Sequence, residues 1–458
     1  MRNAKRGAKA IKDATETYLP KPSGFISLPD SGAAMYAAYQ ARAQFPSLVA
    51  QTIAGMAGVI HRTEAKIEMP AQMEPLWERA TPDGLPLEAF HRRITTELLL
   101  TGRYGVLVDM VEGEALPIFA GYVAETIINW DDTGDFFVLD ETAPVRDGFE
   151  WTERPKWRAL DLEDGRYRVR VFSSDTSEAE PIEPTAMGGK RLDEVPFVAI
   201  GARDLTPDPE DPPLLGVANA SVSIYQLSAD YRWQLFMTGQ ETLFIINGVG
   251  DDAVPQVVGA GVILALNGGD GQTPDAKYVG PAGTGIEAHR KAIEDERQAA
   301  AAAGAKLFET GGASDESGEA KRIRFTAETA TLTTIAQTSA QGLERALRYA
   351  AKMMGLDPEK ITVTPNLDFI DSQLTPADAQ ALVSVWQEGA ISYETLYGNL
   401  QAGGIASAER DHEEELKLID DEDIGTGEPP PEEAGLIMAG ATAGDAGAQM
   451  EVAADGAA

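Results

Sequence analysis

Apolar residues recur at helical spacing in two stretches near the start of the chain. In 33–60 they fall near every third or fourth position, and Pro46 divides this stretch into two predicted helices. The stretch 85–101 predicts a further helix, because Gly102 follows it as the residue that commonly caps a helix C-terminus.

Short runs rich in β-branched and aromatic residues follow these helices. Gly and Asp turns separate the runs, which predicts an antiparallel sheet rather than alternating strand–helix–strand units. The proline-rich segment 207–216 then predicts a boundary. The strand-like runs are 104–111, 116–123, 136–143, 157–165 and 167–175.

Two predicted helices enclose a small β-rich module in the middle of the chain. The first spans 214–239, and the second, dense in Ala and charged residues, begins at 285 and ends near Phe308. Between them, glycine-rich turns join three strand-like pieces, at 241–248, 260–267 and 275–281.

A loop and a long helix are predicted next. The loop, 309–325, is rich in Gly, Ser and acidic residues, a composition typical of mobile segments. The helix spans 327–355, and Gly342 inside it predicts a kink or a close packing contact. Beyond it we expect a short strand at 361–369, a helix with Thr375 as N-cap and Pro376 at its first position, helices at 391–402 and 406–418, and disorder at 421–458.

Composition is that of a globular protein with an acidic surface. The 458 residues predict roughly two to four domains, and the hydrophobic content of 43% is enough for a sizeable core. The net charge of −35 argues against a surface that generally binds nucleic acid or anionic lipid. The basic start lacks an apolar stretch and the longest apolar run, 257–266, is too short for a bilayer, so we expect a soluble intracellular protein.

The residue types exclude several kinds of site. Without cysteine there are no disulfides, thiol catalysis, iron–sulfur clusters or cysteine zinc sites. The glycine-rich segments 248–252 and 267–272 lack a phosphate-loop pattern and predict turns, while the acidic pairs lack EF-hand spacing and indicate a solvated face. A histidine-based triad would have to be assembled from distant segments, because the four histidines lie far apart: His61, His91, His289 and His412.

Basic residues gather on both sides of the predicted loop. They fit phosphate contacts, or ion pairs with acidic residues such as Glu287 and Glu294 between neighbouring helices. Near the N-terminus, Lys5, Lys9 and Lys12 share a helical face, which fits a nucleic-acid or acidic partner, or a frayed and solvated terminus. The basic residues beside the loop are His289, Arg290, Lys291, Arg297, Lys306, Lys321, Arg322 and Arg324.

The order of these elements resembles the portal proteins of tailed bacteriophages. In that family two stem helices flank a clip, and a tunnel loop precedes a long kinked helix. Five motifs resemble one portal subfamily, fall in family order and contain no catalytic residue: YLPKPSG at 18–24, AYQARAQFP at 38–46, GVIHR at 58–62, LTGRYGVLVDM at 100–110 and YVAETIINWDD at 122–132.

The resemblance implies an α+β phage portal fold, assembled as a ring of typically twelve identical subunits at one capsid vertex. The implied segments are a basic N-terminal arm (1–19), an α+β wing (20–213), stem helix 1 (214–240), a small β clip (241–283), stem helix 2 (284–306), a tunnel loop (307–325), a long wing helix and strand (326–369), crown helices (370–420) and an acidic disordered tail (421–458).

The implied function is a channel rather than an enzyme. The terminase would package double-stranded DNA through it, DNA would later be ejected through it, and the head–tail adaptor would dock onto it. The implied partners are copies of the chain itself, the major capsid protein, the terminase large subunit, the adaptor and non-specifically passing DNA, with no cofactor, metal or membrane. The expected location is the portal vertex of the virion, and the host cytoplasm during assembly.

Segment position implies two sets of contact residues. The first, at the DNA channel, is Lys306, Glu309, Ser314, Asp315, Glu316, Glu319, Lys321, Arg322, Arg324, His289, Arg290 and Arg297. The second, on the clip where terminase or adaptor would dock, is Asp251, Asp252, Asn267, Asp270 and Lys277.

Two other functions stay open on the sequence. An acidic metal-dependent hydrolase would need Asp and Glu clustered in a pocket, and its activity would be lost on chelation. Another capsid-assembly protein, such as a scaffold or a plug, is the second alternative. The β module disfavours a scaffold, because scaffolds are usually mostly helical and low in complexity.

Overall fold

The computed structural model contains two compact units, Met1–Phe369 and Ile370–Ala458. Both helices and antiparallel strands occur in it, as the α+β prediction requires. No helix in the described part of the chain combines the length and apolar character of a membrane span. The structure describes residues 1–110, 116–173, 180–239, 242–247, 271, 273–279, 285–304, 318–367, 369, 376–402, 404–407 and 410–421.

The N-terminal arm is part of the core. Helices α1 (Arg2–Arg6) and α2 (Ala8–Asp13) bury Ala4 and Ile11, and Leu19 beyond them is only 1% exposed. Arg2 also pairs with Glu97 at 2.8 Å. The alternative of a frayed, solvated terminus is therefore wrong.

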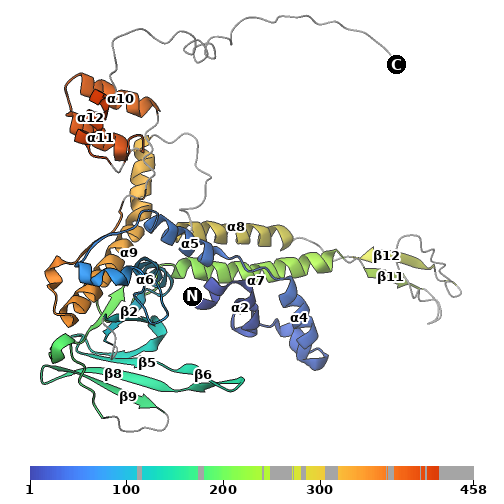
Figure 1. The fold of residues 1–458 in the computed structure, drawn as a ribbon. Coiled ribbons are helices and arrows are strands. Elements are labelled where there is room, and N and C mark those ends of the chain that lie inside the picture. Colours follow the sequence, from blue (N-terminus) through green and yellow to red (C-terminus); the bar gives the residue numbers. More distant parts are fainter. Residues whose placement is uncertain are drawn as a thin grey trace, which may run out of the picture. The chain divides into compact units, whose positions relative to one another are not determined.

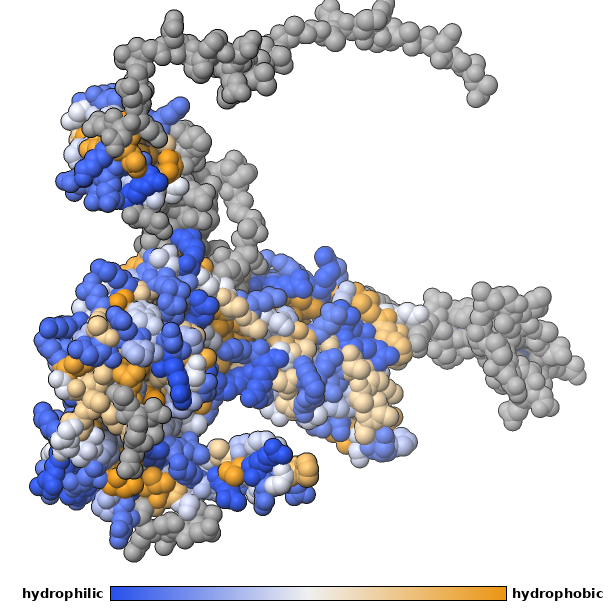
Figure 2. Space-filling model, viewed as in Figure 1, coloured by the Kyte–Doolittle hydropathy of each residue, from blue (hydrophilic) through white to orange (hydrophobic). Residues whose placement is uncertain are grey.

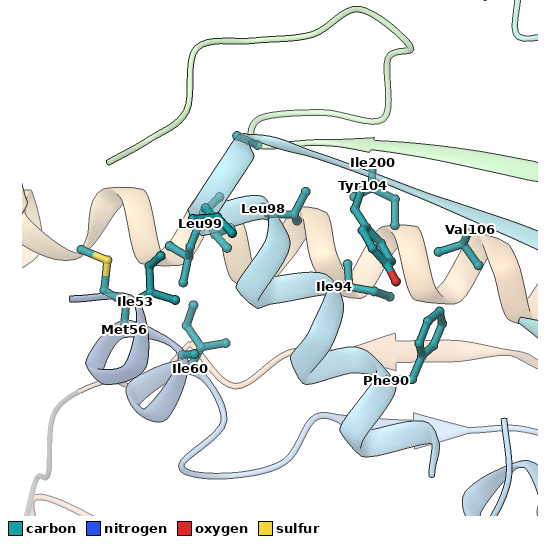
Figure 3. Close-up of a cluster of buried hydrophobic side chains, with 14 of the residues drawn as sticks. Ile53, Met56, Ile60, Phe90, Ile94, Leu98, Leu99, Tyr104, Val106 and Ile200 are labelled. Atoms are coloured by element: carbon teal, nitrogen blue, oxygen red, sulfur yellow. The ribbon is translucent and has the colours of Figure 1, made fainter. Parts of the chain in front are cut away.

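Four α-helices follow the N-terminal arm in the chain. The stretch around Pro46 is divided as predicted, into α4 (Ala33–Arg42) and α5 (Leu48–Ile60), after the short α3 (Ser23–Ile26). Helix α6 (Leu87–Thr101) ends at Gly102, whose φ of 75° is left-handed and favours glycine. Figure 3 shows the buried side chains that α5 and α6 turn toward each other and toward the neighbouring strands, among them Ile53, Met56, Phe90, Ile94, Leu98 and Leu99.

Every strand pair among the described residues is antiparallel, as predicted. A three-stranded sheet has the order β10–β2–β3, with β2 at Arg103–Asp109, β3 at Ile118–Val123 and β10 at Phe197–Gly201. A four-stranded sheet has the order β4–β5–β8–β9, at Ile127–Trp130, Phe136–Asp140, Lys156–Glu163 and Arg166–Ser173. Two further strand pairs are β6 (Ala143–Asp147) with β7 (Glu150–Arg154), and β1 (Lys66–Glu68) with β13 (Thr362–Thr364).

The two helices of the middle region lie side by side and antiparallel (Figure 1). They are α7 (Leu215–Thr238) and α8 (Ile286–Ala302), and an added Cβ on Gly216 would lie 2.8 Å from that of Ala303. The hairpin β11 (Thr242–Ile246) and β12 (Asp275–Val279) lies between them in sequence, while the middle one of the three predicted strand-like pieces, 260–267, is outside the described residues. Helix α8 ends before the expected Phe308, and Gly304 with φ 127° follows it.

Helix α9 (Gly318–Met353) begins inside the segment that we expected to be a loop. Residues 318–325 are helical because good helix formers such as Glu319, Ala320 and Lys321 extend the helix toward its N-terminus. The contact expected at Gly342 is present, since a Cβ there would lie 2.4 Å from Cδ1 of Ile200. The helix ends before Gly355. Among the described residues of the strand expected at 361–369, β13 covers Thr362–Thr364.

The second unit contains three described helices, α10 (Pro376–Gln387), α11 (Tyr393–Ala402) and α12 (His412–Asp421). The Ser392 hydroxyl caps α11 by accepting a hydrogen bond from the Thr395 backbone N–H at 3.1 Å. The Asp411 carboxylate caps α12 by accepting one from the Glu414 backbone N–H at 2.7 Å. The predicted N-cap Thr375 and the tail 422–458 lie outside the described residues.

Candidate functional site

A groove of about 1000 Å³ lies beside the α7–α8 pair. Its walls come from α2, from the linker between α4 and α5 (residues 43–47), and from one side each of α7 and α8. The floor is apolar: Phe45 is 7% exposed and Ile224 4%, and Ile293 of α8 lies beside them. On the face drawn in Figure 2 the surface over α8 is mostly hydrophilic, so the apolar floor contrasts with its surroundings.

The charged residues that line this groove are mostly cations, although the chain carries −35 overall. The lining contains two carboxylates, Glu287 and Glu294, and five cationic side chains. This local excess of positive charge attracts an anionic group, and the apolar floor favours one that also brings apolar or small side chains. The cationic side chains are those of Lys12, Arg232, Arg290, Lys291 and Arg297.

The two carboxylates are already paired on α8 itself. Arg290 Nε donates to Glu287 at 3.0 Å, and Arg297 lies 3.8 Å from Glu294. The Arg290 guanidinium lowers the pKa of Glu287 from its ordinary value. Acidic residues therefore do pair with these arginines, but three positions away along one helix and not between neighbouring helices as the ion-pair interpretation expected.

The other three cations have no carboxylate partner within the described residues. Lys12 Nζ donates to the Ala41 carbonyl at 3.2 Å, and Arg232 donates to the Gln44 side chain. Lys291 is exposed on α8 and makes no hydrogen bond or ion pair with a described residue. These three charges are available to a group that enters the groove.

Hydrogen bonds fix the wall formed by the linker. The Gln44 backbone N–H donates to Ser228 Oγ of α7 at 2.9 Å, and Gln40 Nε2 of α4 donates to the Lys12 carbonyl oxygen at 2.8 Å. Farther along α7, Trp233 packs against Phe25 at 5.7 Å between ring centroids. The groove is thus bounded by segments that the fold holds in place.

Of the predicted channel residues whose side chains the structure describes, Arg290 and Arg297 come together, and both line the groove. His289 lies half-buried on α8, and Lys277 on β12 pairs with Asp275 at 3.2 Å. Glu319, Lys321, Arg322 and Arg324 lie on the first turns of α9 by their backbone. The other predicted residues lie outside the described part: Lys306, Glu309, Ser314, Asp315, Glu316, Asp251, Asp252, Asn267 and Asp270.

A second cluster, at a cavity of about 270 Å³, was missed from the sequence. His61 at the end of α5 and His91 of α6 lie edge to face, 4.8 Å apart between ring centroids. The His61 ring hydrogen-bonds to Thr95 at 2.8 Å and the His91 ring to Ser339 at 3.3 Å. No sequence signal pointed to the pair, because its members come from two helices that only the fold brings together.

Burial keeps both imidazoles neutral near pH 7. Desolvation lowers the pKa of His91 to about 3, and desolvation together with the nearby Arg92 charge lowers that of His61 to about 4. Ser339 is fully buried, so it is not reachable as a nucleophile. Among the described residues no group of three or more His, Asp or Glu side chains is placed to hold a metal ion. The hydrolase alternative needs such a group.

Comparisons with known proteins give a partial match and several distant structural likenesses. The family described as "Domain of unknown function (DUF4055)" matches residues 213–354, from the start of α7 to the end of α9. No curated protein matches the chain. The chain is similar to a chain in the neck of an empty GTA particle computed with C6 symmetry, with 16% identity, a TM-score of 0.39, and coverage of 84% of this chain and 93% of that one.

Two further structures show the same degree of likeness. One is the neck of a native GTA particle computed with C12 symmetry, with 17% identity, a TM-score of 0.39, and coverage of 78% of this chain and 90% of that one. The other is the virion of a native gene transfer agent particle, with 16% identity, a TM-score of 0.39, and coverage of 85% and 97%. At this TM-score the likeness assigns no function to the chain.

Proposed function

We propose that the protein is the portal, or connector, of a phage-like particle. It forms a ring at one capsid vertex, double-stranded DNA is packaged and ejected through the ring, and the terminase and the head–tail adaptor dock onto it. The motifs that resemble one portal subfamily support this proposal.

The observation that carries the proposal is the antiparallel α7–α8 pair with the β11–β12 hairpin inserted between its helices. The 24 residues of α7 span about 36 Å at 1.5 Å per residue, so copies of this rod can stand side by side around an axis. In this assignment α7 and α8 are the stem, the hairpin belongs to the clip, and α9 returns the chain to the wing.

Charge supports the proposal as well. A channel for duplex DNA must not hold its cargo, because each Lys or Arg contact to a phosphate adds affinity. Twelve chains of −35 carry −420 formal charges in total, a ring that repels phosphates. We propose that the few basic residues beside the tunnel loop, such as Lys306, Lys321 and Arg322, make limited phosphate contacts without reading bases.

Imaging of the purified full chain by electron microscopy tests the proposal. Class averages should show a closed ring with an axial hole, and duplex DNA should bind the ring weakly at physiological salt. A compact particle without a channel would contradict the proposal. If that particle also had a chelation-sensitive hydrolytic activity, the metal-dependent hydrolase would be the better assignment.

A further inference from the structure

We propose that the groove beside α7 and α8 receives the opposite, acidic face of α8 from a second copy of this chain. The inference rests on the proposed ring and names the residues that join neighbouring subunits. It assigns the cationic groove one occupant, a helix face that is rich in alanine and carries unpaired carboxylates.

The acidic face of α8 is defined by Ala288, Ala292, Asp295, Glu296 and Ala299. Four of them, at 288, 292, 295 and 299, follow the spacing that places residues on one helical stripe. Asp295 and Ala299 are exposed, and neither Asp295 nor Glu296 pairs with a cation within the described residues. The small alanine side chains allow another surface to approach α8 closely.

The groove contains the cations and the apolar surface that would complement the acidic face of α8. Lys12, Arg232 and Lys291 have no carboxylate partner there, and the apolar floor matches a stripe of alanine methyl groups. When the acidic face of one copy enters the groove of another, its two carboxylates come close to the three cations. The local charges are then complementary, although the net charge of −35 makes whole chains repel one another. A phosphate backbone would satisfy the cations but would leave the apolar floor without an apolar contact.

The two surfaces lie on different sides of α8. At about 100° per residue, the stripe of Asp295 and Ala299 is roughly 160° around the helix from the groove-lining Arg290 and Arg297, while Lys291 lies at the edge of the groove, roughly 40° from Asp295. Two complementary patches on opposite sides of one subunit form a head-to-tail contact, and such contacts generate closed rings when the rotation closes. A self-complementary dimer would require a single patch instead.

Charge reversal tests the pairing in the full-length chain. The acidic-face variant, Asp295→Lys with Glu296→Lys, and the groove variant, Lys12→Glu with Arg232→Glu, should each raise the apparent dissociation constant of the assembly at least about tenfold, because like charges then meet. The variant with all four substitutions should reassemble, since both sides are reversed. Circular dichroism verifies that each variant is folded.

The matched control is Glu78→Lys with Glu359→Lys, two exposed carboxylates outside the groove that make the same change of net charge as the acidic-face variant. It should assemble like the unmodified chain. A ring that forms equally in all variants would overturn the pairing and leave the portal proposal standing. If the unmodified chain forms no ring, both fail. Loss of duplex DNA binding without loss of assembly in the groove variant would make the groove a nucleic-acid site and overturn the inference.

Discussion

Lowering the pH from 7 to 5 should destabilise the unit Met1–Phe369, chiefly through His61 and His91. In the folded chain their pKa values are about 4 and about 3, below the ordinary value of 6.5 that applies after unfolding. Below pH 6.5 the unfolded chain therefore binds protons that the folded chain does not bind. Stability falls as the pH falls through 6.5, and the loss continues until the folded-state values are reached.

The size of the loss follows from the two pKa values. At pH 5 each histidine lies about 1.5 units below its unfolded pKa, and one unit corresponds to about 1.36 kcal/mol. Each contributes roughly 2 kcal/mol, so the pair together lowers the free energy of unfolding by roughly 4 kcal/mol. Glu88 offsets part of this loss, because the neighbouring Glu64 carboxyl raises the pKa of Glu88 and its protonation at low pH favours the folded chain.

Urea unfolding at pH 7 and at pH 5, followed by far-ultraviolet circular dichroism, measures the effect. The variant His91→Gln removes one titrating group and should reduce the loss between the two pH values to about half. His412→Gln is the control, because His412 is only half-buried and lies in the other unit. An equal loss in His91→Gln and in the unmodified chain would refute the reasoning.

Two predictions concern packing. Adding the same methyl group at two helical glycines should have opposite effects on thermal stability. Gly58→Ala has open space around it and should gain up to about 1 kcal/mol, whereas Gly342→Ala meets the buried Ile200 and should lose about 1–3 kcal/mol. Equal melting shifts in the two variants would contradict this. Leu98→Ala, at a fully buried core position, should cost about 2–5 kcal/mol of unfolding free energy, and an unchanged urea midpoint would show that Leu98 does not fill the core.

Local sequence signals predicted the elements that have strong caps or a clear period. Pro46 and Gly102 marked real helix ends, and 214–239 is helical as expected. Strand β10 was not predicted, because Phe197–Gly201 is a short, fully buried run without the alternation of apolar and polar residues that identifies a strand. The hairpin β6–β7 was not predicted either, because all residues of its two strands are exposed and no buried face gives an alternating pattern.

The candidate site was only half predictable. The cations of α8 stand out in the sequence, but Lys12 and Arg232 join them only because the linker after α4 packs on α7. That contact joins Gln44 to Ser228, a separation of 184 residues that no local pattern reports. The burial of the N-terminal arm also depends on long-range contacts, because Ile11 belongs to a hydrophobic core whose other members come from distant segments.

The mass of the purified full-length chain in solution tests the central claim most directly. Light scattering should give about twelve times 48.9 kDa, or about 590 kDa, at a concentration where the assembly is stable. A ring of another closed number would keep the claim and correct the count. A mass of one chain, unchanged at high protein concentration and at lowered or raised salt, would contradict it.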